Sequence, residues 1–318
     1  MWLDLLDRQK LVERAYQKGT KLTLNNDTYL AWLNAFFEKE YLDDIGDGDV
    51  TSKAILTKNE PRKAILKAKA SGVISGLEEV TWFLRKHSLA VKLHKKDGNE
   101  IFNGDIILEI RGGQKDILAT ERIALNVLQR MSGISTETRR LVDLLEDYNT
   151  RIAATRKTLL RYLDKKAAFL GGGLTHRFGL WDSILIKDNH LETLKQEFKE
   201  GYIEASIARA SAFSDKVDFI EIEVTSTEDA LRAARSFRNL TFKIPCVIML
   251  DNMVPSLIDE TLETLRKSNL YDFALLEASG AIKPDNIQEY AKTGVDVISL
   301  GYLTHSVHAL DMSLEMTL

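Results

Sequence analysis

Cysteine is almost absent from this sequence: Cys246 is the only one in 318 residues. A single thiol excludes an intramolecular disulfide and any metal site built from several cysteines. Cys246 begins the apolar run 246–250. We therefore expect a small buried hydrophobic side chain there, because a reactive thiol needs an electropositive and partly exposed environment.

Long apolar runs and a charge excess are also lacking. No run approaches the roughly 20 apolar residues of a membrane span, and the N-terminus is acidic early, without a basic start and apolar core. The 43 Lys and Arg against 47 Asp and Glu give a net charge of −4, which argues against a nucleic-acid partner. These absences predict a cytoplasmic protein that acts on neither nucleic acid nor membrane.

The composition, 44% hydrophobic and 28% charged, is that of an ordinary globular chain and excludes a disordered chain, a collagen-like repeat and a coiled coil. The length corresponds to about two domains of roughly 150 residues. The chain is therefore long enough for a sizeable core.

The first 150 residues alternate between helical and strand-like patterns. Residues 1–42 have helical spacing, and the first ~25 look like an added amphipathic segment. The loop 43–49 has four aspartates and two glycines, but lacks the ligand spacing of an EF-hand, so we expect a turn that caps the segment from Thr51.

Short strands are predicted within residues 62–112. A lipoyl- or biotinyl-carrier domain is disfavoured there, because no lysine stands at a tight hairpin tip. Residues 115–148 are helical, and we expect Gly133 to divide them into two helices.

The second half carries six short apolar runs, which begin near residues 151, 183, 218, 246, 274 and 296. Helical stretches such as 227–237 and 255–266 separate them. Apolar strands that alternate with helices predict a parallel sheet buried on both faces. Each run ends in polar residues, and the carboxyl ends of barrel strands carry active sites.

This predicted rim has a basic part and an acidic part. The early strands and the triple-glycine loop supply Arg and Lys side chains that suit a small polyanion, while the later strands supply carboxylates that suit Mg²⁺. The last turns are rich in glycine and hydroxyls, which suits phosphate. The rim therefore predicts transfer of a phosphorylated group onto an acidic substrate.

Other interpretations of single features remain beside this one. The triple glycine is not a Walker loop, because no Gly-Lys-Ser/Thr follows it. His190, His305 and His308 could form a metal site with the acids, but we favour hydrogen-bonding roles. Glu221 and Glu223 share one strand face, so one of them could serve only as an ion-pair partner.

The ordered motifs resemble the quinolinate phosphoribosyltransferase family, also called nicotinate-nucleotide pyrophosphorylase (carboxylating). The resemblance extends from about residue 30 to the end of the chain. It rests on the segments 47–51, 120–126, 155–158, 171–177, 185–190, 221–224, 250–253, 277–280 and 301–306.

The resemblance implies an α/β protein with an N-terminal α/β sandwich and an incomplete β/α (TIM-like) barrel. The sandwich would comprise residues 1–133, including the helical extension and a return of 308–318, and the catalytic barrel would comprise 134–307. Quinolinate and phosphoribosyl pyrophosphate would react with Mg²⁺ present to give nicotinate mononucleotide, pyrophosphate and CO₂. The family also implies a homodimer or higher homo-oligomer with shared active sites.

The family's motifs assign roles to residues of this chain. Quinolinate would be bound by Arg122 of a neighbouring subunit together with Arg156, Lys157, His176, Arg177 and Lys187. The catalytic residues would be Lys157, Lys187, Glu223 and Asp251. Glu223 and Asp251 would also hold the metal, directly or through water. Phosphoribosyl pyrophosphate would contact Glu223, Asp251, Ser279, Gly280, Gly301, Thr304, His305 and Ser306.

Three positions depart from the family pattern. Ala154 stands where Asp is usual, the turn after Thr158 is about two residues shorter, and Thr175 stands where Asn is usual before His176. The first two lie beside a substrate arginine, so they concern substrate affinity and the path of the loop. Two alternatives therefore stay open: a relative that acts on another aromatic acid, and a non-catalytic anion-binding homologue.

Overall fold

The computed structural model of the chain describes residues 5–239 and 244–317. Within these residues no helix is both long and apolar enough to cross a membrane. The chain divides into two compact units. One unit holds residues 1–18, 140–159 and 173–305, and the other holds residues 19–139, 160–172 and 306–318.

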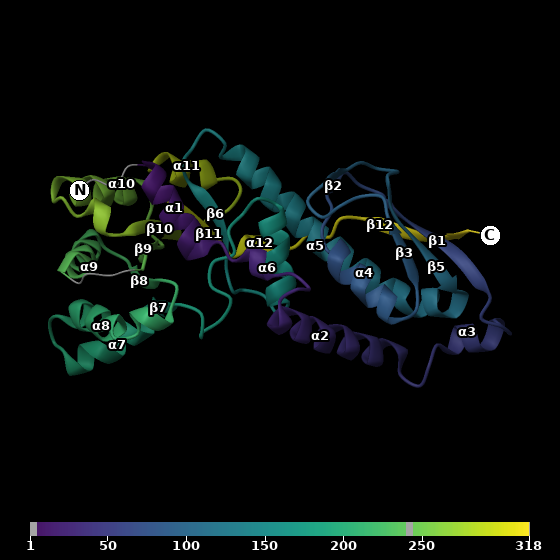
Figure 1. The fold of residues 1–318 in the computed structure, drawn as a ribbon. Helices are drawn as coiled ribbons and strands as arrows, with labels where there is room; N and C mark the ends of the chain where they lie inside the picture. The colour runs from purple at the N-terminus through teal and green to yellow at the C-terminus, as the bar shows by residue number, and fades with distance from the viewer. Residues whose placement is uncertain (1–4, 240–243, 318) are drawn as a thin grey trace. The chain divides into compact units, whose positions relative to one another are not determined.

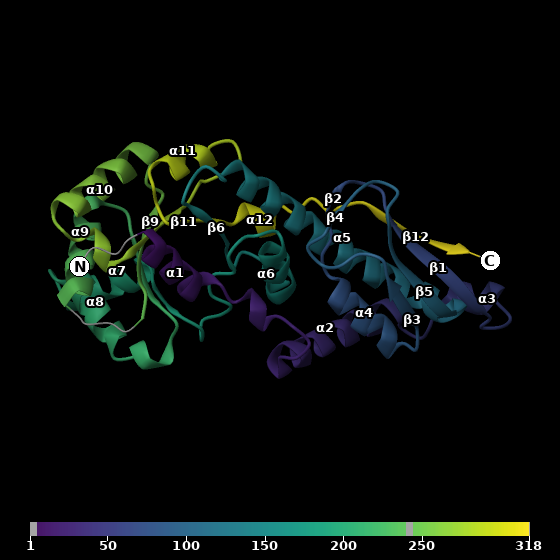
Figure 2. The ribbon, with the colours of Figure 1, turned by 45° about the horizontal axis from the view of Figure 1, so that its top comes forward.

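The first unit is built on a six-stranded parallel sheet with helices around it (Figures 1 and 2), which confirms the predicted β/α barrel. The strand order is β6-β11-β10-β9-β8-β7. The strands are β6 (Arg151–Ala154), β7 (Ile184–Ile186), β8 (Ile220–Val224), β9 (Cys246–Asp251), β10 (Leu275–Ser279) and β11 (Val297–Leu300). The helices that follow are α7 (Asp188–Glu197), α8 (Tyr202–Ser211), α9 (Thr227–Asn239), α10 (Pro255–Lys267), α11 (Ile287–Lys292) and α12 (Tyr302–His305), with 3₁₀ turns η2 (Ser214–Lys216) and η3 (Tyr271–Phe273).

Side chains alternate between the two faces of this sheet. Even-numbered strand residues such as Ile222, Ile248 and Leu276 belong to the core shared with the helices. Odd-numbered residues such as Val247 and Leu275 belong to a separate interior cluster. Because successive side chains of a strand point to opposite faces, the odd-numbered series supplies the barrel interior from its floor to its rim.

Helix α1 (Leu5–Tyr16) closes the floor of this interior. Its buried residues Val12, Ala15 and Tyr16 have the spacing of one helix face and pack on the first inward residues of the strands, such as Leu275 and Val297. Arg8 fixes the other end of the helix. Its guanidinium pairs with Asp296 and donates to the backbone oxygens of Tyr271 (3.1 Å) and Ala274 (3.0 Å). The predicted domain 1–133 therefore differs from the structural units, because residues 1–18 cluster with the barrel.

The second unit is built on the antiparallel sheet β12-β1-β5-β3. The C-terminal strand β12 pairs with β1, Lys63 opposite Thr317. Its strands are β1 (Pro61–Ala68), β3 (Ala90–Leu93), β5 (Ile106–Gly113) and β12 (Met312–Thr317), with the separate pair β2 (Gly72–Val73) and β4 (Glu100–Ile101). Its helical elements are η1 (Gly19–Lys21), α2 (Asp27–Ile45), α3 (Val50–Ile55), α4 (Leu77–Lys86), α6 (Arg161–Leu170) and most of α5 (Gln114–Leu144).

Two local predictions in this unit have different outcomes. Asp49 caps α3, since its carboxylate accepts from the backbone N–H of Ser52 at 3.0 Å, as expected for the aspartate-rich loop. The prediction that Gly133 divides two helices is wrong, because α5 runs through it without a break. A Cβ on Gly133 would lie 2.0 Å from the backbone oxygen of His308. Close packing against that carbonyl, rather than helix termination, explains this glycine.

Candidate active site

A cavity of about 510 Å³ opens at the carboxyl ends of the barrel strands. This volume and position suit a small-molecule site. Every strand residue in its wall is odd-numbered, because only the odd-numbered side chains of these strands point into the barrel interior. The lining residues are Thr155, Arg156, Lys157, His176, Arg177, Leu185, Lys187, Glu223, Met249, Asp251, Asn252, Glu277, Ser279, Gly280, Ala281 and Ser299.

One wall of the cavity is basic. Arg156 and Lys157 follow β6, Lys187 follows β7, and Arg177 comes from the loop between them. Burial and the neighbouring charge of Arg156 lower the pKa of Arg177. The guanidinium groups of Arg156 and Arg177 repel each other and can each bind a carboxylate, so together they suit an anion with more than one carboxylate.

The acids Glu223 and Asp251 also line the cavity. Burial and the charge of Asp251 raise the pKa of Glu223, although Lys187 Nζ lies 3.3 Å from its carboxylate and acts in the opposite direction. Two neighbouring carboxylates at the rim offer the oxygen ligands that Mg²⁺ prefers. These residues therefore fit a magnesium ion that keeps several waters.

Below the rim, His176 stands between two buried acids. Its Nε2 lies 3.3 Å from a carboxylate oxygen of Glu221 and 3.3 Å from one of Glu277. Burial lowers the pKa of His176, but the two carboxylates outweigh burial and raise it to about 9. The backbone of His176 is left-handed, with φ 54°, and its Nδ1 accepts from the backbone N–H of Arg177 at 2.7 Å. These three residues could meet the geometry of a cation site, but a protonated His176 has no free ring nitrogen for a metal and itself supplies a positive charge between the two acids.

In the turn after β10, the backbone at Gly280 packs closely against Asn252. Gly280 has φ +87°, and a Cβ there would lie 2.3 Å from Oδ1 of Asn252. The N–H of Asn252 donates to the backbone oxygen of Ser279 at 2.8 Å. A larger residue at Gly280 would block this corner of the cavity, which suits a backbone that contacts phosphate.

The structure gathers most of the predicted site residues but separates a few. Those that line the cavity are Arg156, Lys157, His176, Arg177, Lys187, Glu223, Asp251, Ser279 and Gly280. Gly301, Thr304 and His305 are outside the lining but adjoin it: Thr304 Oγ1 donates to the backbone oxygen of Lys157 at 3.0 Å, and a Cβ on Gly301 would meet both Lys157 and His305. Arg122, an exposed residue of α5, and Ser306 belong to the other unit.

Several lining residues were not predicted from the sequence. Glu277, Thr155 and Ser299 belong to the odd-numbered inward series, and this two-residue period could have found them. Glu221 is the member of its pair that serves as an ion-pair partner, since it is fully buried against His176. His190 has a hydrogen-bonding role, because its Nδ1 accepts from the backbone N–H of Lys187 at 3.0 Å.

The departures at Ala154 and Thr175 lie away from the cavity wall. Ala154 is a buried strand residue whose N–H donates to the backbone oxygen of Leu174 at 2.9 Å. Thr175 is buried, and its hydroxyl accepts from the N–H of Lys18 at 2.9 Å. Neither side chain faces the cavity.

Two sequence profiles match the chain. The profile described as "Quinolinate phosphoribosyl transferase, C-terminal domain" matches residues 134–315, and the corresponding N-terminal domain profile matches residues 49–132. Together they cover more than half of the chain.

Relatives and solved structures agree with these profiles. A protein of Methanothermobacter thermautotrophicus named "Probable nicotinate-nucleotide pyrophosphorylase [carboxylating]" is 39% identical over 277 residues, which is 86% of this chain and 95% of that protein. A Bacillus subtilis protein of the same name is 38% identical, over 90% of this chain and 92% of that protein. The solved nicotinate-nucleotide pyrophosphorylase from Francisella tularensis superposes with a TM-score of 0.76 at 30% identity, over 90% of this chain and 96% of that one.

Proposed function

Because the chain belongs to the quinolinate phosphoribosyltransferase family, we propose that it transfers the phosphoribosyl group of phosphoribosyl pyrophosphate to quinolinate. The products are nicotinate mononucleotide, pyrophosphate and CO₂, so the enzyme serves NAD biosynthesis. Homologues with this activity in their names are similar over most of the chain.

The observation that carries the proposal is the pair Arg156 and Arg177 on one cavity wall. Burial and the charge of Arg156 lower the pKa of Arg177, so a dianion bound between the two side chains would compensate positive charges that repel each other. Quinolinate has two adjacent carboxylates, and each can accept charge-assisted hydrogen bonds from a guanidinium. Lys157 and Lys187 add further positive charge on the same side.

The acids of the same cavity suit the other substrate. When pyrophosphate departs, positive charge develops on the ribose ring, and Glu223 and Asp251 lie where they can stabilise it. We propose that these two carboxylates also hold Mg²⁺, which when bound neutralises the leaving pyrophosphate. Ser279 and Gly280 supply a hydroxyl and backbone for a phosphate group.

The ring nitrogen of quinolinate then becomes cationic as it bonds to the ribose carbon. This cation stabilises the electron pair left at the adjacent carbon when its carboxylate leaves as CO₂, and that carbon takes up a proton. Much of the acceleration comes from holding two anions together that repel each other in solution. Arg156 and Arg177 line the same cavity as Glu223 and Asp251, so one cavity can hold both substrates.

The proposed assembly rests on the family resemblance. Arg122 is exposed on α5, and we propose that it reaches the quinolinate site of a neighbouring subunit in a homodimer or larger homo-oligomer. A cytoplasmic location stays a prediction from the sequence.

The substitution Arg177→Ala tests the assigned substrate. One charge-assisted hydrogen bond contributes about 1.5–3 kcal/mol, so we expect the KM for quinolinate to rise roughly 10- to 150-fold. The KM for phosphoribosyl pyrophosphate should change little. Arg209→Ala is the matched control, because Arg209 is an exposed arginine of α8 paired with Glu197.

Three results would contradict the proposal. An equal rise of both KM values would contradict the assignment of Arg177 to quinolinate binding. Turnover with nicotinate but not with quinolinate would show that the enzyme is a family relative whose substrate is another aromatic acid. Tight quinolinate binding without turnover in the presence of Mg²⁺ would show a non-catalytic binding protein.

A further inference from the structure

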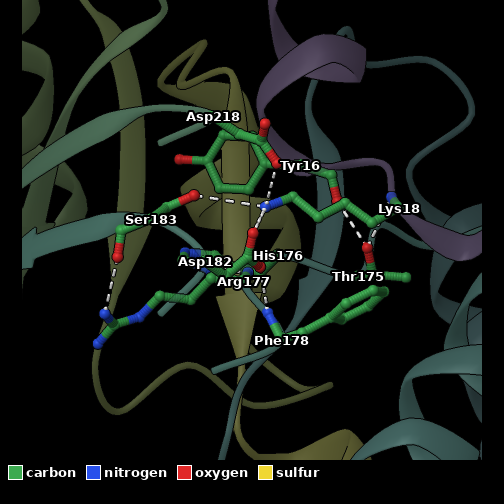
Figure 3. Close-up of polar contacts among 9 residues, drawn as sticks. All are labelled: Tyr16, Lys18, Thr175, His176, Arg177, Phe178, Asp182, Ser183 and Asp218. Atoms are coloured by element: carbon green, nitrogen blue, oxygen red, sulfur yellow. Dashed lines mark hydrogen bonds and ion pairs between the residues drawn. The ribbon is translucent and has the colours of Figure 1, made fainter. Parts of the chain in front are cut away.

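The segment that follows α1 contacts the loop that carries His176 and Arg177 (Figure 3). The family profiles begin at residue 49, so this segment lies outside them. Residues 1–18 nevertheless cluster with the barrel that holds the cavity. The contacts are therefore a feature of this chain that the family match does not describe.

The first set of contacts is made by backbone atoms. The carbonyl oxygen of Tyr16 accepts from the N–H of Thr175 (3.1 Å), the hydroxyl of Thr175 (2.8 Å) and the N–H of His176 (2.9 Å). The N–H of Lys18 donates to the same hydroxyl at 2.9 Å. The Tyr16 ring meets the His176 ring edge-on, with centroids 4.9 Å apart. The backbone entering His176 is thus tied to the end of α1.

The second set is made by the ammonium group of Lys18. Its side chain is 3% exposed and forms ion pairs with Asp182 and with Asp218, the latter at 3.0 Å. It also donates to the hydroxyl of Ser183 at 3.3 Å. Figure 3 shows this nitrogen where the three side chains converge.

The partners of Lys18 in turn hold Arg177 itself and the residue that follows it. The second carboxylate oxygen of Asp182 accepts from the N–H of Phe178 at 2.5 Å. The backbone oxygen of Ser183 accepts from the guanidinium of Arg177 at 3.1 Å. A continuous set of polar contacts therefore runs from Lys18 to Arg177.

We propose that Lys18 is a positioning residue for the acid substrate, and that residues 8–18 are a built-in brace for the loop 175–183. Lys18 does not line the cavity; it acts through Asp182 and Ser183. The identity of the substrate rests on the proposed function, whereas the bracing of the loop does not.

This brace offsets a conformational cost in the loop. His176 has a left-handed backbone, which is uncommon for a residue with a side chain, and Arg177 is a buried cation. A loop that must hold both side chains needs fixed partners, because a misplacement of about 1 Å lowers binding and rate strongly. The same contacts explain why this chain has Thr175 where the family pattern has Asn: its hydroxyl donates to the carbonyl oxygen of Tyr16 and accepts from the N–H of Lys18.

The brace should act on one substrate more than on the other. His176 and Arg177 belong to the braced loop, whereas Glu223, Asp251 and Ser279 belong to the carboxyl-terminal ends of sheet strands. Loss of the brace should therefore weaken the binding of quinolinate and spare that of phosphoribosyl pyrophosphate.

The test compares Lys18→Met with Lys10→Met in the full-length protein. Both variants remove an ammonium group from the same N-terminal segment, but the Lys10 side chain is 78% exposed. Hydrogen exchange of the 174–183 amides, followed by mass spectrometry, should accelerate by about tenfold or more in Lys18→Met and stay unchanged in Lys10→Met. The KM for quinolinate should rise about tenfold in Lys18→Met, with the KM for phosphoribosyl pyrophosphate within about twofold.

Two further variants keep the test decisive if Lys18→Met folds poorly. Thr175→Val keeps the ion pairs and removes only the hydroxyl, and Lys18→Met with Asp182→Asn removes both charges together. Thr175→Val should show the same split between the two KM values at smaller amplitude. The double variant should fold better than Lys18→Met, and its 174–183 amides should still exchange faster than those of the wild type.

The outcomes separate the brace from a plain stabilising role. Unchanged exchange in the 174–183 amides of the folded variants, or a lower Tm with both KM values unchanged, would overturn the proposal. Faster exchange in a protein that does not turn over quinolinate would support the brace and reject the proposed function instead.

Discussion

Glu221 and Glu277 look alike but should respond oppositely to substitution. Both are fully buried, and both place an oxygen 3.3 Å from Nε2 of His176. Burial and the charge of Glu277 raise the pKa of Glu221 to about 7. Burial also acts to raise the pKa of Glu277, but the charge of His176 outweighs it and the pKa of Glu277 is lowered.

The substitution Glu221→Gln should therefore raise Tm at alkaline pH. The folded-state pKa of Glu221 lies above the unfolded value of 4.5, so its contribution to stability is present below pH 4.5 and lost as pH rises through 7. The cost of this raised pKa is on the order of a few kcal/mol where the carboxylate is ionised in both the folded and the unfolded state, and it is smaller at pH 5.5. Gln keeps the shape and an oxygen acceptor for Nε2, and removes this cost.

The assay is thermal unfolding of the wild type, Glu221→Gln and Glu277→Gln at pH 5.5 and 8.5. The advantage of Glu221→Gln over the wild type should grow by about 2 kcal/mol between these pH values, or roughly 4–8 °C in Tm. Glu277→Gln should lower Tm at both, because a carboxylate with a lowered pKa stabilises the fold above pH 4.5. A Tm difference for Glu221→Gln that does not depend on pH, or a higher Tm for Glu277→Gln at pH 8.5, would refute the charge assignment.

Two other predictions concern α1 and the single thiol. Arg8→Met should destabilise the barrel unit by about 3 kcal/mol, because it leaves the carboxylate of Asp296 without its buried partner; a Tm equal to that of Lys10→Met would contradict this. Burial raises the pKa of Cys246 to about 12, so the native protein at pH 8 should resist a thiol reagent that labels it fully in urea. Rapid labelling without urea would show that the thiol is accessible.

The barrel and much of its site follow from local patterns in the sequence. Strands β6–β11 begin within two residues of the predicted apolar runs, because short apolar runs that alternate with helical stretches favour parallel strands covered on both faces. The polar residues at their ends, such as Lys187 and Asp251, then meet at one rim. The two-residue period of a strand also explains why Glu277 faces inward although its neighbours in the chain do not.

The remaining features depend on contacts between residues distant in the chain. Lys18 resembles any lysine after an amphipathic helix, and its role appears only when Asp182, 164 residues later, is brought against it. Gly133 carries the usual helix penalty of roughly 1 kcal/mol, but a carbonyl that packs against it makes any larger side chain worse. The domain to which α1 belongs is set by which apolar surface it covers, and no local pattern records that surface.

The central claim is that this cavity joins quinolinate to a phosphoribosyl group and releases one carboxylate. The most direct measurement is the stoichiometry of nucleotide and CO₂ from quinolinate labelled in its 2-carboxylate, incubated with phosphoribosyl pyrophosphate and Mg²⁺. The account predicts equal amounts of nicotinate mononucleotide, pyrophosphate and labelled CO₂. A nucleotide that keeps both carboxylates, or no nucleotide while quinolinate binds tightly, would contradict it.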